Sequence, residues 1–233
     1  MLVYWLKMTL ESDTTFGRGD GVAGLVDAEV QHDVVGLPFL AGRTLKGLLA
    51  SECEDLVFAL LKASRDPDNR WRAAADGLFG VSGAMETGAG QLHVGPASLP
   101  DELRAVLAYD IEQSAVRPGA RPPADSVTRA DVLDTLTVLR RQTAMDESGA
   151  PRPETLRTFR AVTRGLTFTA RLTFDSKPSD DELALLAATV KALRRVGTSR
   201  NRGRGKVRAR LCDAQGTDIT DTCFELFSQE VRA

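Results

Sequence analysis

Alternating apolar and polar positions mark strands at both ends of this chain. Leu2 to Leu10 alternates and opens on apolar residues, which predicts a strand. From Gly165 to Phe174 leucine, phenylalanine and alanine share one face, while threonine and arginine share the other. A strand with this pattern buries one face and leaves the other in water. Two further strands are predicted at Gln91–Ala97 and at Lys206–Cys212.

Helical spacing of apolar residues follows two of these strands. A first helix is predicted from Thr44 to about Ala63, on a stripe of leucines and a valine. Ser179 and Glu182 have the spacing of a capping box, in which each side chain satisfies a backbone N–H of the other's segment. They open a second helix whose buried face is predicted to hold Leu183, Leu186, Val190 and Leu193.

The order of these elements predicts an α+β fold. Strand, helix, strand, then strand, helix, strand is βαββαβ, the ferredoxin-like (RRM-like) arrangement, and such a four-stranded sheet is a common platform for single-stranded RNA. We expect one domain over 1–233. Its palm is predicted to comprise about 1–98 and 163–213, with an insertion or thumb at about 99–162 and a C-terminal tail at 214–233.

The insertion is too long for a plain loop in a compact domain. It is predicted to contain a short helix at 101–108 and a proline-rich, extended excursion at 117–126. Thr135–Gln142 and Leu156–Val162 are predicted to form a long, irregular hairpin. Before the insertion, Gly77–Gly80 is predicted to be a turn.

Composition narrows the class of protein. The 233 residues are 42% hydrophobic, which is enough for a sizeable core, and no apolar run approaches the ~18 residues that a membrane helix needs. Three cysteines without CxxC spacing favour a reducing, cytoplasmic location. With two histidines in the chain, a structural zinc site is not expected.

Charge is concentrated rather than diffuse. The chain has 30 Lys and Arg against 32 Asp and Glu, yet 194–210 contains eight cations and no acid, punctuated by three glycines. Arginine forks match phosphate oxygens, and glycine permits close approach of another chain. This stretch predicts a local groove for a nucleic-acid backbone, with solvated charges on a twisted hairpin as the alternative. The candidates are Gly197, Arg200, Arg202, Gly203, Arg204, Gly205 and Lys206.

Four segments together resemble one family. They are a glycine loop at 16–21 (FGRGDG), a helix start at 36–47 (GLPFLAGRTLKG), LFG at 78–80 followed by GQL at 90–92, and the terminal glycine loop at 197–205. In this order they resemble the RAMP superfamily. The resemblance is specifically to a Csm/Cmr-like backbone subunit of a type III CRISPR-Cas effector complex.

The resemblance implies a function and partners. Such a subunit holds guide (CRISPR) RNA on its palm, contacts complementary target RNA, and stacks with copies or paralogues of itself and with other effector subunits; no membrane is involved. It implies guide contacts at the first glycine loop, through Arg18, and at the first helix, where Arg43, Thr44 and Lys46 join a free helix N-terminus. Arg140 and Arg141 on the candidate hairpin are further RNA-binding candidates.

Catalysis rests on one aspartate. The resemblance places Asp27 where catalytic members cut target RNA with Mg²⁺ or another divalent cation, although Ala28-Glu29 stands where Asn-Pro is usual. A carboxylate can bind the metal or act as a base, so Asp27 is both the catalytic and the metal-binding candidate. Three alternatives stay open. The chain is a non-catalytic structural subunit without a cofactor, or it is a guide-processing endoribonuclease that uses His32. The third is a ferredoxin-like small-molecule or interaction domain unrelated to RNA.

Overall fold

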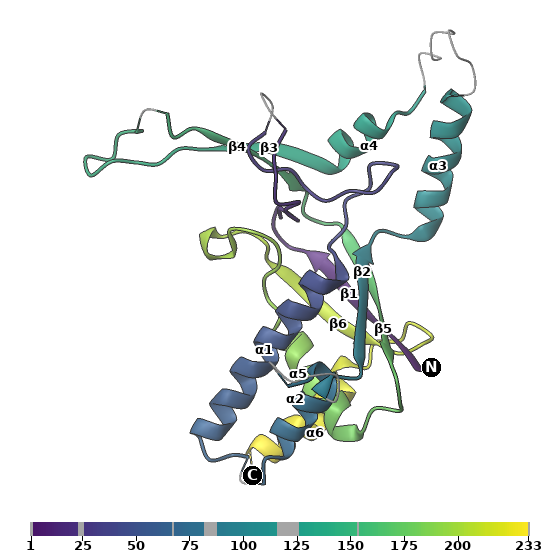
Figure 1. Cartoon of the computed structure of the whole chain (residues 1–233), viewed down its shortest axis with the longest axis vertical. Helices are drawn as coiled ribbons and strands as arrows, with labels where there is room; N and C mark the ends of the chain where they lie inside the picture. Colours follow the sequence, from purple (N-terminus) through teal and green to yellow (C-terminus); the bar gives the residue numbers. More distant parts are fainter. Residues whose placement is uncertain are drawn as a thin grey trace.

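A four-stranded antiparallel sheet forms the centre of the molecule. The computed structural model describes residues 2–22, 26–66, 68–81, 88–115, 126–152 and 154–232. The strands occur in the order β2-β5-β1-β6 (Figure 1). Their bounds are β1 (Leu2–Leu10), β2 (Leu92–Ser98), β5 (Thr167–Phe174) and β6 (Val207–Cys212). The predicted ferredoxin-like palm is confirmed.

The register of β1 sorts its side chains between two faces. β1 lies in the middle of the sheet, antiparallel to β5 on one side and to β6 on the other. Leu6 is opposite Ala170 and Leu211, and all three are fully buried. Directly opposed side chains point to the same side of a sheet. The inner face is therefore apolar, and the alternate residues of each strand form an outer sheet face.

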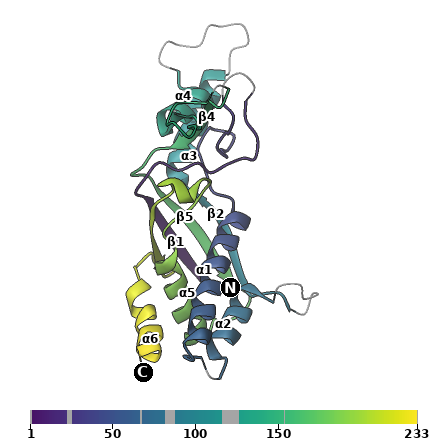
Figure 2. The ribbon, with the colours of Figure 1, turned by 90° about the vertical axis from the view of Figure 1, so that its left-hand side faces the viewer.

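Helices cover only the inner face. They are α1 (Gly42–Lys62), α2 (Arg70–Phe79), α5 (Asp180–Ala192) and α6 (Thr220–Arg232), and all four lie on the same side of the sheet (Figures 1 and 2). The capping box at Ser179 and Glu182 is present, with the Ser179 N–H donating to Glu182 Oε2 at 2.7 Å. Helix α5 is buried almost throughout because it is sandwiched between the sheet, α1 and α6.

The insertion between β2 and β5 forms a separate hairpin and two helices. Strands β3 (Thr137–Gln142) and β4 (Arg157–Val162) pair antiparallel, as predicted. The hairpin projects from the top of the molecule on the helix-covered side (Figures 1 and 2). It is preceded by α3 (Asp101–Ala115), seven residues longer than expected, and by α4 (Arg129–Leu136). Most of the predicted extended excursion at 117–126 lies outside the described residues.

Three details of the sequence interpretation were wrong. Gly77–Gly80 is not a turn, because 77–79 form the last residues of α2, and Leu78 is fully buried. Residues 135 and 136 belong to α4 rather than to a strand, since Thr128 and Asp131 cap this helix reciprocally. The segment 214–233 is more than a tail. It contains α6, which brings Phe227 to 4.8 Å from the ring of Trp71.

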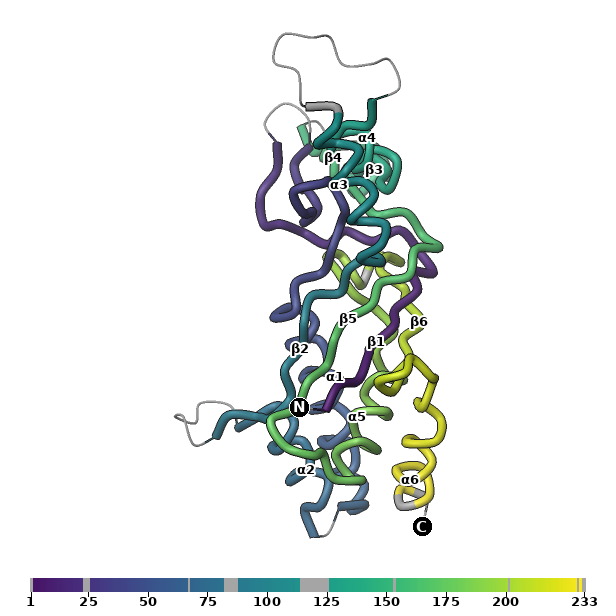
Figure 3. The backbone as a smooth tube through the Cα atoms, turned by 90° about the vertical axis from the view of Figure 1, so that its right-hand side faces the viewer, coloured from purple at the N-terminus to yellow at the C-terminus, as the bar shows by residue number. Residues whose placement is uncertain are grey.

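Among the described residues, no helix layer covers the outer sheet face. Viewed from the side opposite the hairpin, β2, β5, β1 and β6 lie in front, and α1 and α5 lie behind them (Figure 3). Within the described ranges, no helix is long and apolar enough to cross a membrane.

Candidate nucleic-acid interface

The glycine loop, residues 194–206, is a folded hairpin between α5 and β6. Val196 N–H donates to Gly205 O at 2.9 Å, and a short 3-10 turn at Arg200–Arg202 forms the tip. Gly197 and Gly205 both have positive φ. A Cβ on Gly197 would lie 2.6 Å from Thr15 O, and one on Gly205 would collide with Val196 O. These two predicted glycines are therefore required by the path of the backbone.

The loop is attached to the chain that follows β1. Thr198 N–H donates to Thr15 O at 3.0 Å, and Gly205 N–H donates to Asp13 O at 3.3 Å. Thr15 is buried, and its hydroxyl donates to Arg160 O of β4 at 2.9 Å. The glycine loop, the segment after β1 and the hairpin are thus joined by hydrogen bonds. This explains how residues so far apart in sequence are brought to one place.

The cations of the loop have different surroundings. Arg200 and Arg202 are exposed at the tip, and among the described residues neither lies within 4 Å of a carboxylate. Arg204 lies over the ring of Phe159, with its guanidinium carbon 3.7 Å from the ring centroid. Lys206 is already paired, through Glu11 Oε2 at 2.8 Å. Arg200 and Arg202 are therefore accessible to a phosphate at the tip of the loop.

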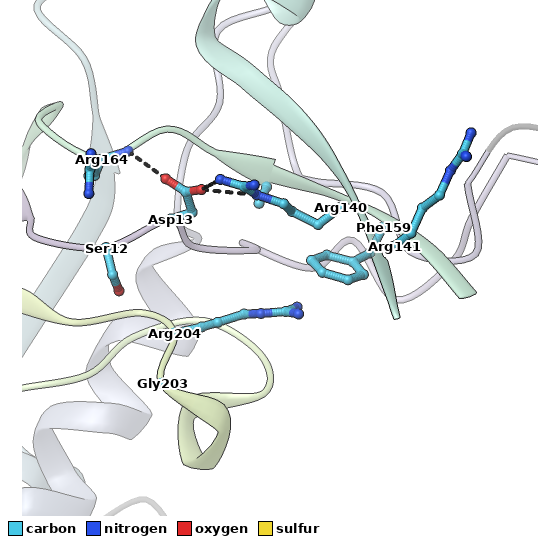
Figure 4. A pocket seen from close by; sticks show the side chains of 9 residues that line it. Ser12, Asp13, Arg140, Arg141, Phe159, Arg164, Gly203 and Arg204 are labelled. Atoms are coloured by element: carbon cyan, nitrogen blue, oxygen red, sulfur yellow. Dashed lines mark hydrogen bonds and ion pairs between the residues drawn. The ribbon is translucent and has the colours of Figure 1, made fainter. Parts of the chain in front are cut away.

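Hairpin arginines face the loop from the other side. Arg140 of β3 is opposite Phe159 of β4 in the register, so both side chains point the same way. Asp13 accepts from Arg140 Nη2 at 2.5 Å and from the backbone N–H of Arg164 at 3.2 Å (Figure 4). Burial acts to raise the pKa of Asp13, but these hydrogen bonds outweigh it and hold the pKa below its ordinary value.

A cleft of about 420 Å³ separates the loop from the hairpin. Arg204 and Phe159 approach each other across it, whereas Arg141 extends along the hairpin, away from Asp13 (Figure 4). Burial lowers the pKa of Arg204, and the charges of Arg202 and Arg140 lower it further, as expected where cations crowd together. The lining residues are Ser12, Asp13, Arg140, Arg141, Phe159, Ala161, Arg164, Gly203 and Arg204.

The chemistry of this cleft suits a phosphate backbone. Four arginines line it against one aspartate, so its walls carry excess positive charge in a chain whose net charge is −2. Guanidinium groups bind phosphate oxygens in a planar, two-pronged manner. The buried ring of Phe159 supports one of them, Arg204, through a cation–π contact. We expect the cleft, hereafter the arginine cleft, to hold a nucleic-acid strand.

The first-helix candidates are less uniform than predicted. Arg43 and Thr44 are exposed at the start of α1. Lys46 is partly buried, and its ammonium donates to Leu92 O at 2.7 Å. Burial also lowers the pKa of Lys46. Lys46 therefore ties α1 to β2, which leaves Arg43 and Thr44 as the accessible pair.

Two candidates near the first glycine loop have partners of their own. Arg18 forms an exposed ion pair with Asp20, with Nε 2.6 Å from Oδ1. The neighbouring Gly17 lies against the glycine loop, since a Cβ there would come 3.0 Å from a methyl carbon of Thr198. His32 has its Nδ1 3.1 Å from Arg129 Nη2, which places a guanidinium against the imidazole proposed as the alternative acid or base.

Asp27 lies beside β4 near the outer end of the hairpin strands. Its backbone N–H donates to Thr158 O at 2.7 Å, and its Oδ2 accepts from Thr158 N–H at 2.6 Å. Asp27 is exposed, and Thr158 is next to Phe159 of the arginine cleft. The aspartate is thus fixed in position beside the cleft with its carboxylate open to solvent.

The ligands for a divalent cation fit only in part. Among the described residues no three His, Cys, Asp or Glu side chains come together as a ready metal site. Mg²⁺, however, keeps several waters and is often held by one or two carboxylates plus substrate phosphates. Asp27 has the right donor chemistry to be the protein's carboxylate in such a set. The remaining ligands would then be water and RNA.

Beneath the hairpin lies a buried ion pair that was not anticipated from the sequence. Arg160 and Glu29 are 3.0 Å apart, with side chains 8% and 4% exposed. Arg160 also donates to Asp134 Oδ1 at 2.6 Å and to Thr137 Oγ1 at 3.0 Å. This network connects the segment after Asp27 to α4 and to both hairpin strands. It fixes the orientation of the hairpin over the palm.

Sequence reasoning missed the residues that complete the cleft. Phe159, Asp13 and Arg164 were not candidates, because they lie far from the glycine loop in sequence. The predicted hairpin was the available signal, since an aromatic residue among arginines on a strand is typical of RNA-binding surfaces, although Phe159 itself is only 6% exposed. No sequence pattern predicted the ion pair between Asp13 and Arg140.

Comparison with known proteins now identifies the relatives of this chain. The family model described as RAMP superfamily matches residues 7–208. A solved structure titled as the type III-B Cmr-beta complex bound to cognate target RNA contains a similar chain, with a TM-score of 0.60 and 15% identity over 91% of this chain and 97% of that one. A second, titled as the apo state of the same complex, gives 0.60 and 17% over 90% and 97%. No curated protein matches in sequence.

Proposed function

This chain belongs to the RAMP superfamily, and we propose that it binds guide RNA as a backbone subunit of a type III CRISPR effector complex. The observation that carries the proposal is the arginine cleft, where the glycine loop and the hairpin place four arginines around a space of about 420 Å³. The similarity of fold to chains of Cmr-beta complexes, one of them bound to target RNA, supports the same assignment.

Recognition in this cleft concerns the backbone rather than the bases. Arginine contacts to phosphates position a strand but carry no sequence information. In an RNA-guided complex, sequence is read by pairing between guide and target. A subunit of this kind therefore binds any guide sequence with similar affinity and loses affinity steeply as salt rises. Its partners are the guide, the target paired with it, and the neighbouring subunits along the guide.

The test is RNA binding by the purified chain as a function of salt. Arg200→Gln combined with Arg202→Gln removes the two exposed cations at the tip of the glycine loop. Each phosphate contact on a single strand contributes about 0.7 to the slope of log K against log salt, so we expect the slope to fall by about 1.4. Lys177→Gln is the matched control, because Lys177 is an exposed cation just after the end of β5 that is remote from the hairpin.

Two results would contradict the proposal. One is a slope in the double variant equal to that of the wild type. The other is an equal loss of affinity in the Lys177→Gln control, which would mean that any surface cation contributes and no groove exists. Thermal melting of each variant confirms that the chain is folded, so that lost binding reports on the tip of the glycine loop, which borders the cleft.

Cleavage of bound target RNA through Asp27 is the second part of the proposal. Asp27 is anchored by both of its hydrogen bonds to Thr158, stands beside the arginine cleft and is exposed. A divalent cation bound there would neutralise charge on the scissile phosphate. The chain itself supplies the fixed carboxylate, which can also accept a proton from the attacking hydroxyl, and it holds the strand still through the arginines.

The alternative roles have less support from the geometry. Guide processing through His32 would require an imidazole that is free to exchange protons with RNA. Here the His32 ring is against the Arg129 guanidinium, and its Nδ1 is 3.1 Å from Asp33 O. A purely structural subunit would share the arginine cleft and differ only in the role of Asp27, so substitution of Asp27 distinguishes the two.

A further inference from the structure

The outer sheet face carries a distinctive set of side chains. The four palm strands contain no Asp or Glu, and their four Lys and Arg residues all point to this face, as the alternation with buried positions shows. The antiparallel register places Arg171 opposite Trp5, Arg210 opposite Lys7, and Arg208 opposite Thr9. The cations therefore form a band across three neighbouring strands, β5, β1 and β6.

An aromatic side chain lies within this band. Trp5 is at the middle of the central strand β1 and is only partly buried. A hollow of about 510 Å³ lies over Trp5 and Lys7, between the first turn of α3 and the turn at 214–216 after β6. A tryptophan face in a hollow of this size is accessible to a flat ring from outside the protein.

The cations of the band are only weakly engaged by the protein. Arg208 pairs with Glu11 and Arg210 with Asp218, but the two arginine side chains are 64% and 54% exposed. Exposed pairs of this kind contribute little to stability and are easily exchanged for another anion. Among the described residues, Arg171 has no carboxylate within 4 Å. A phosphate approaching this face would meet available donors.

We propose that the outer sheet face binds single-stranded nucleic acid, with a base stacked on Trp5 and phosphates on Lys7, Arg171 and Arg210. Aromatic side chains within a basic surface are the combination that holds single strands without sequence preference. A four-stranded sheet presents bases this way in other RNA-binding folds. This surface is distinct from the arginine cleft, because the hairpin and the glycine loop that line the cleft project on the other, helix-covered side of the sheet (Figures 1 and 3).

The charge pattern favours a nucleic acid over a protein partner. A protein interface core is depleted of charged residues, whereas this face has four cations and no acid within its strands. Four acids lie at its rim. Glu11 and Asp218 pair with the two arginines of β6, and Asp101 and Glu102 at the start of α3 line the hollow beside Trp5 and Lys7. Among the described residues, no carboxylate lies within 4 Å of Lys7 or Arg171, and Arg171 is directly opposite Trp5 in the register, so a cation of β5 lies next to the aromatic ring.

Tryptophan fluorescence tests the proposal directly. The chain has two tryptophans, and Trp71 is buried against Phe227, so an oligouridylate added to the protein can quench only Trp5 by contact. We expect saturable quenching at low salt that disappears at high salt. An abasic oligonucleotide of the same length should bind without quenching. Trp5→Ala should weaken binding of the oligouridylate by on the order of tenfold, and Trp5→Phe by less.

A second measurement removes the dependence on Trp71. Incorporation of 5-fluorotryptophan gives two ¹⁹F signals in the unaltered chain, and only that of Trp5 should shift on titration. The double variant of Arg200 and Arg202 should keep this shift, because it alters the other face, while Arg171→Gln should require several-fold more ligand. These outcomes distinguish binding at the outer face from binding at the arginine cleft. They do so whether or not the salt-dependence experiment supports guide binding in the cleft.

Three outcomes would overturn the proposal. They are an unmoved Trp5 signal while RNA binds, loss of the Trp5 shift in the glycine-loop variant, and a Trp5 shift that follows protein concentration with a doubling of mass and no nucleic acid. The last of these would make the outer face a contact between protein chains.

Discussion

Substitution of Arg160 tests whether a buried ion pair fixes the hairpin. Arg160→Met removes the guanidinium but keeps a side chain of similar length. Glu29 would then be buried with one remaining hydrogen bond, from the Val30 N–H at 2.9 Å. A charge left in the interior without its partner typically costs about 3–5 kcal/mol. For a chain of this size that corresponds to a fall of about 6–20 °C in Tm.

The partner substitution should cost less, and this asymmetry is the sharper prediction. Glu29→Gln leaves Arg160 bonded to Asp134 and to Thr137. We expect a loss of about 1–3 kcal/mol, the cost of weakening a buried hydrogen bond. The double variant Arg160→Met with Glu29→Gln should lose less stability than the sum of the two single losses, because it leaves no buried carboxylate without a partner. Coupling between contacting residues is usually about 0.5–3 kcal/mol.

Urea denaturation followed by the fluorescence of the buried Trp71 measures all three variants. Arg72→Met serves as the control, since its ion pair with Glu54 is outside the hairpin and its partner is 58% exposed. We expect that control to lose no more than about 1 kcal/mol. Equal losses from the two single changes, or losses that add in the double variant, would refute the idea that Glu29 depends on Arg160.

Three further predictions concern chemistry and stability. Asp27→Asn keeps an acceptor for the Thr158 N–H but removes the carboxylate charge. The assembled complex should therefore bind target RNA normally and lose one or more of the regularly spaced cuts in that RNA. An unchanged cutting pattern would make the subunit a scaffold. Gly205 has φ +72° and lies against a carbonyl oxygen, so Gly205→Ala should destabilise the chain by about 2 kcal/mol or more. Gly203 has φ +77° but open space around it, so Gly203→Ala should cost about 1 kcal/mol. Equal melting temperatures of the two variants would contradict this. Burial raises the pKa of Cys53 to about 11, above that of the unfolded thiol. The free energy of unfolding should therefore be unaffected by this thiol below pH 9 and fall between pH 9 and about 11. Urea titrations of Cys53→Ala should show a smaller decline over that pH range.

The palm could be predicted because its signals are local. The strands alternate between apolar and polar residues, and the capping box needs only four consecutive positions, from Ser179 to Glu182. The helix α2 was missed because the LFG motif reads as a turn, although the burial of Trp71 and Leu78 holds the segment helical. Tertiary packing overrode the local preference for a turn. The register of β1 depends on contacts across the fold that no local pattern carries.

The candidate site was predictable in composition but not in pairing. The dense arginines at 194–210 marked the loop correctly as a cationic feature. Which cations are available depends on carboxylates elsewhere in the chain. Glu11 forms an ion pair with Lys206, Asp13 with Arg140, and Asp20 with Arg18. Asp20 is two positions from Arg18, but only the fold brings Glu11 and Asp13 to their cations, so counting charges overestimates the number of accessible cations.

The position of β1 in the sheet has a consequence for synthesis of the protein. β1 is made before the other described strands, yet among them it pairs only with β5 and β6, which begin at Thr167 and Val207. During synthesis its apolar face therefore stays without strand partners until these two later strands have left the ribosome. Long-range pairing of this kind slows folding and exposes strands to aggregation. We therefore expect any fragment that ends before Val207 to leave β1 as an open edge, and the last strand to complete the palm as a single late event.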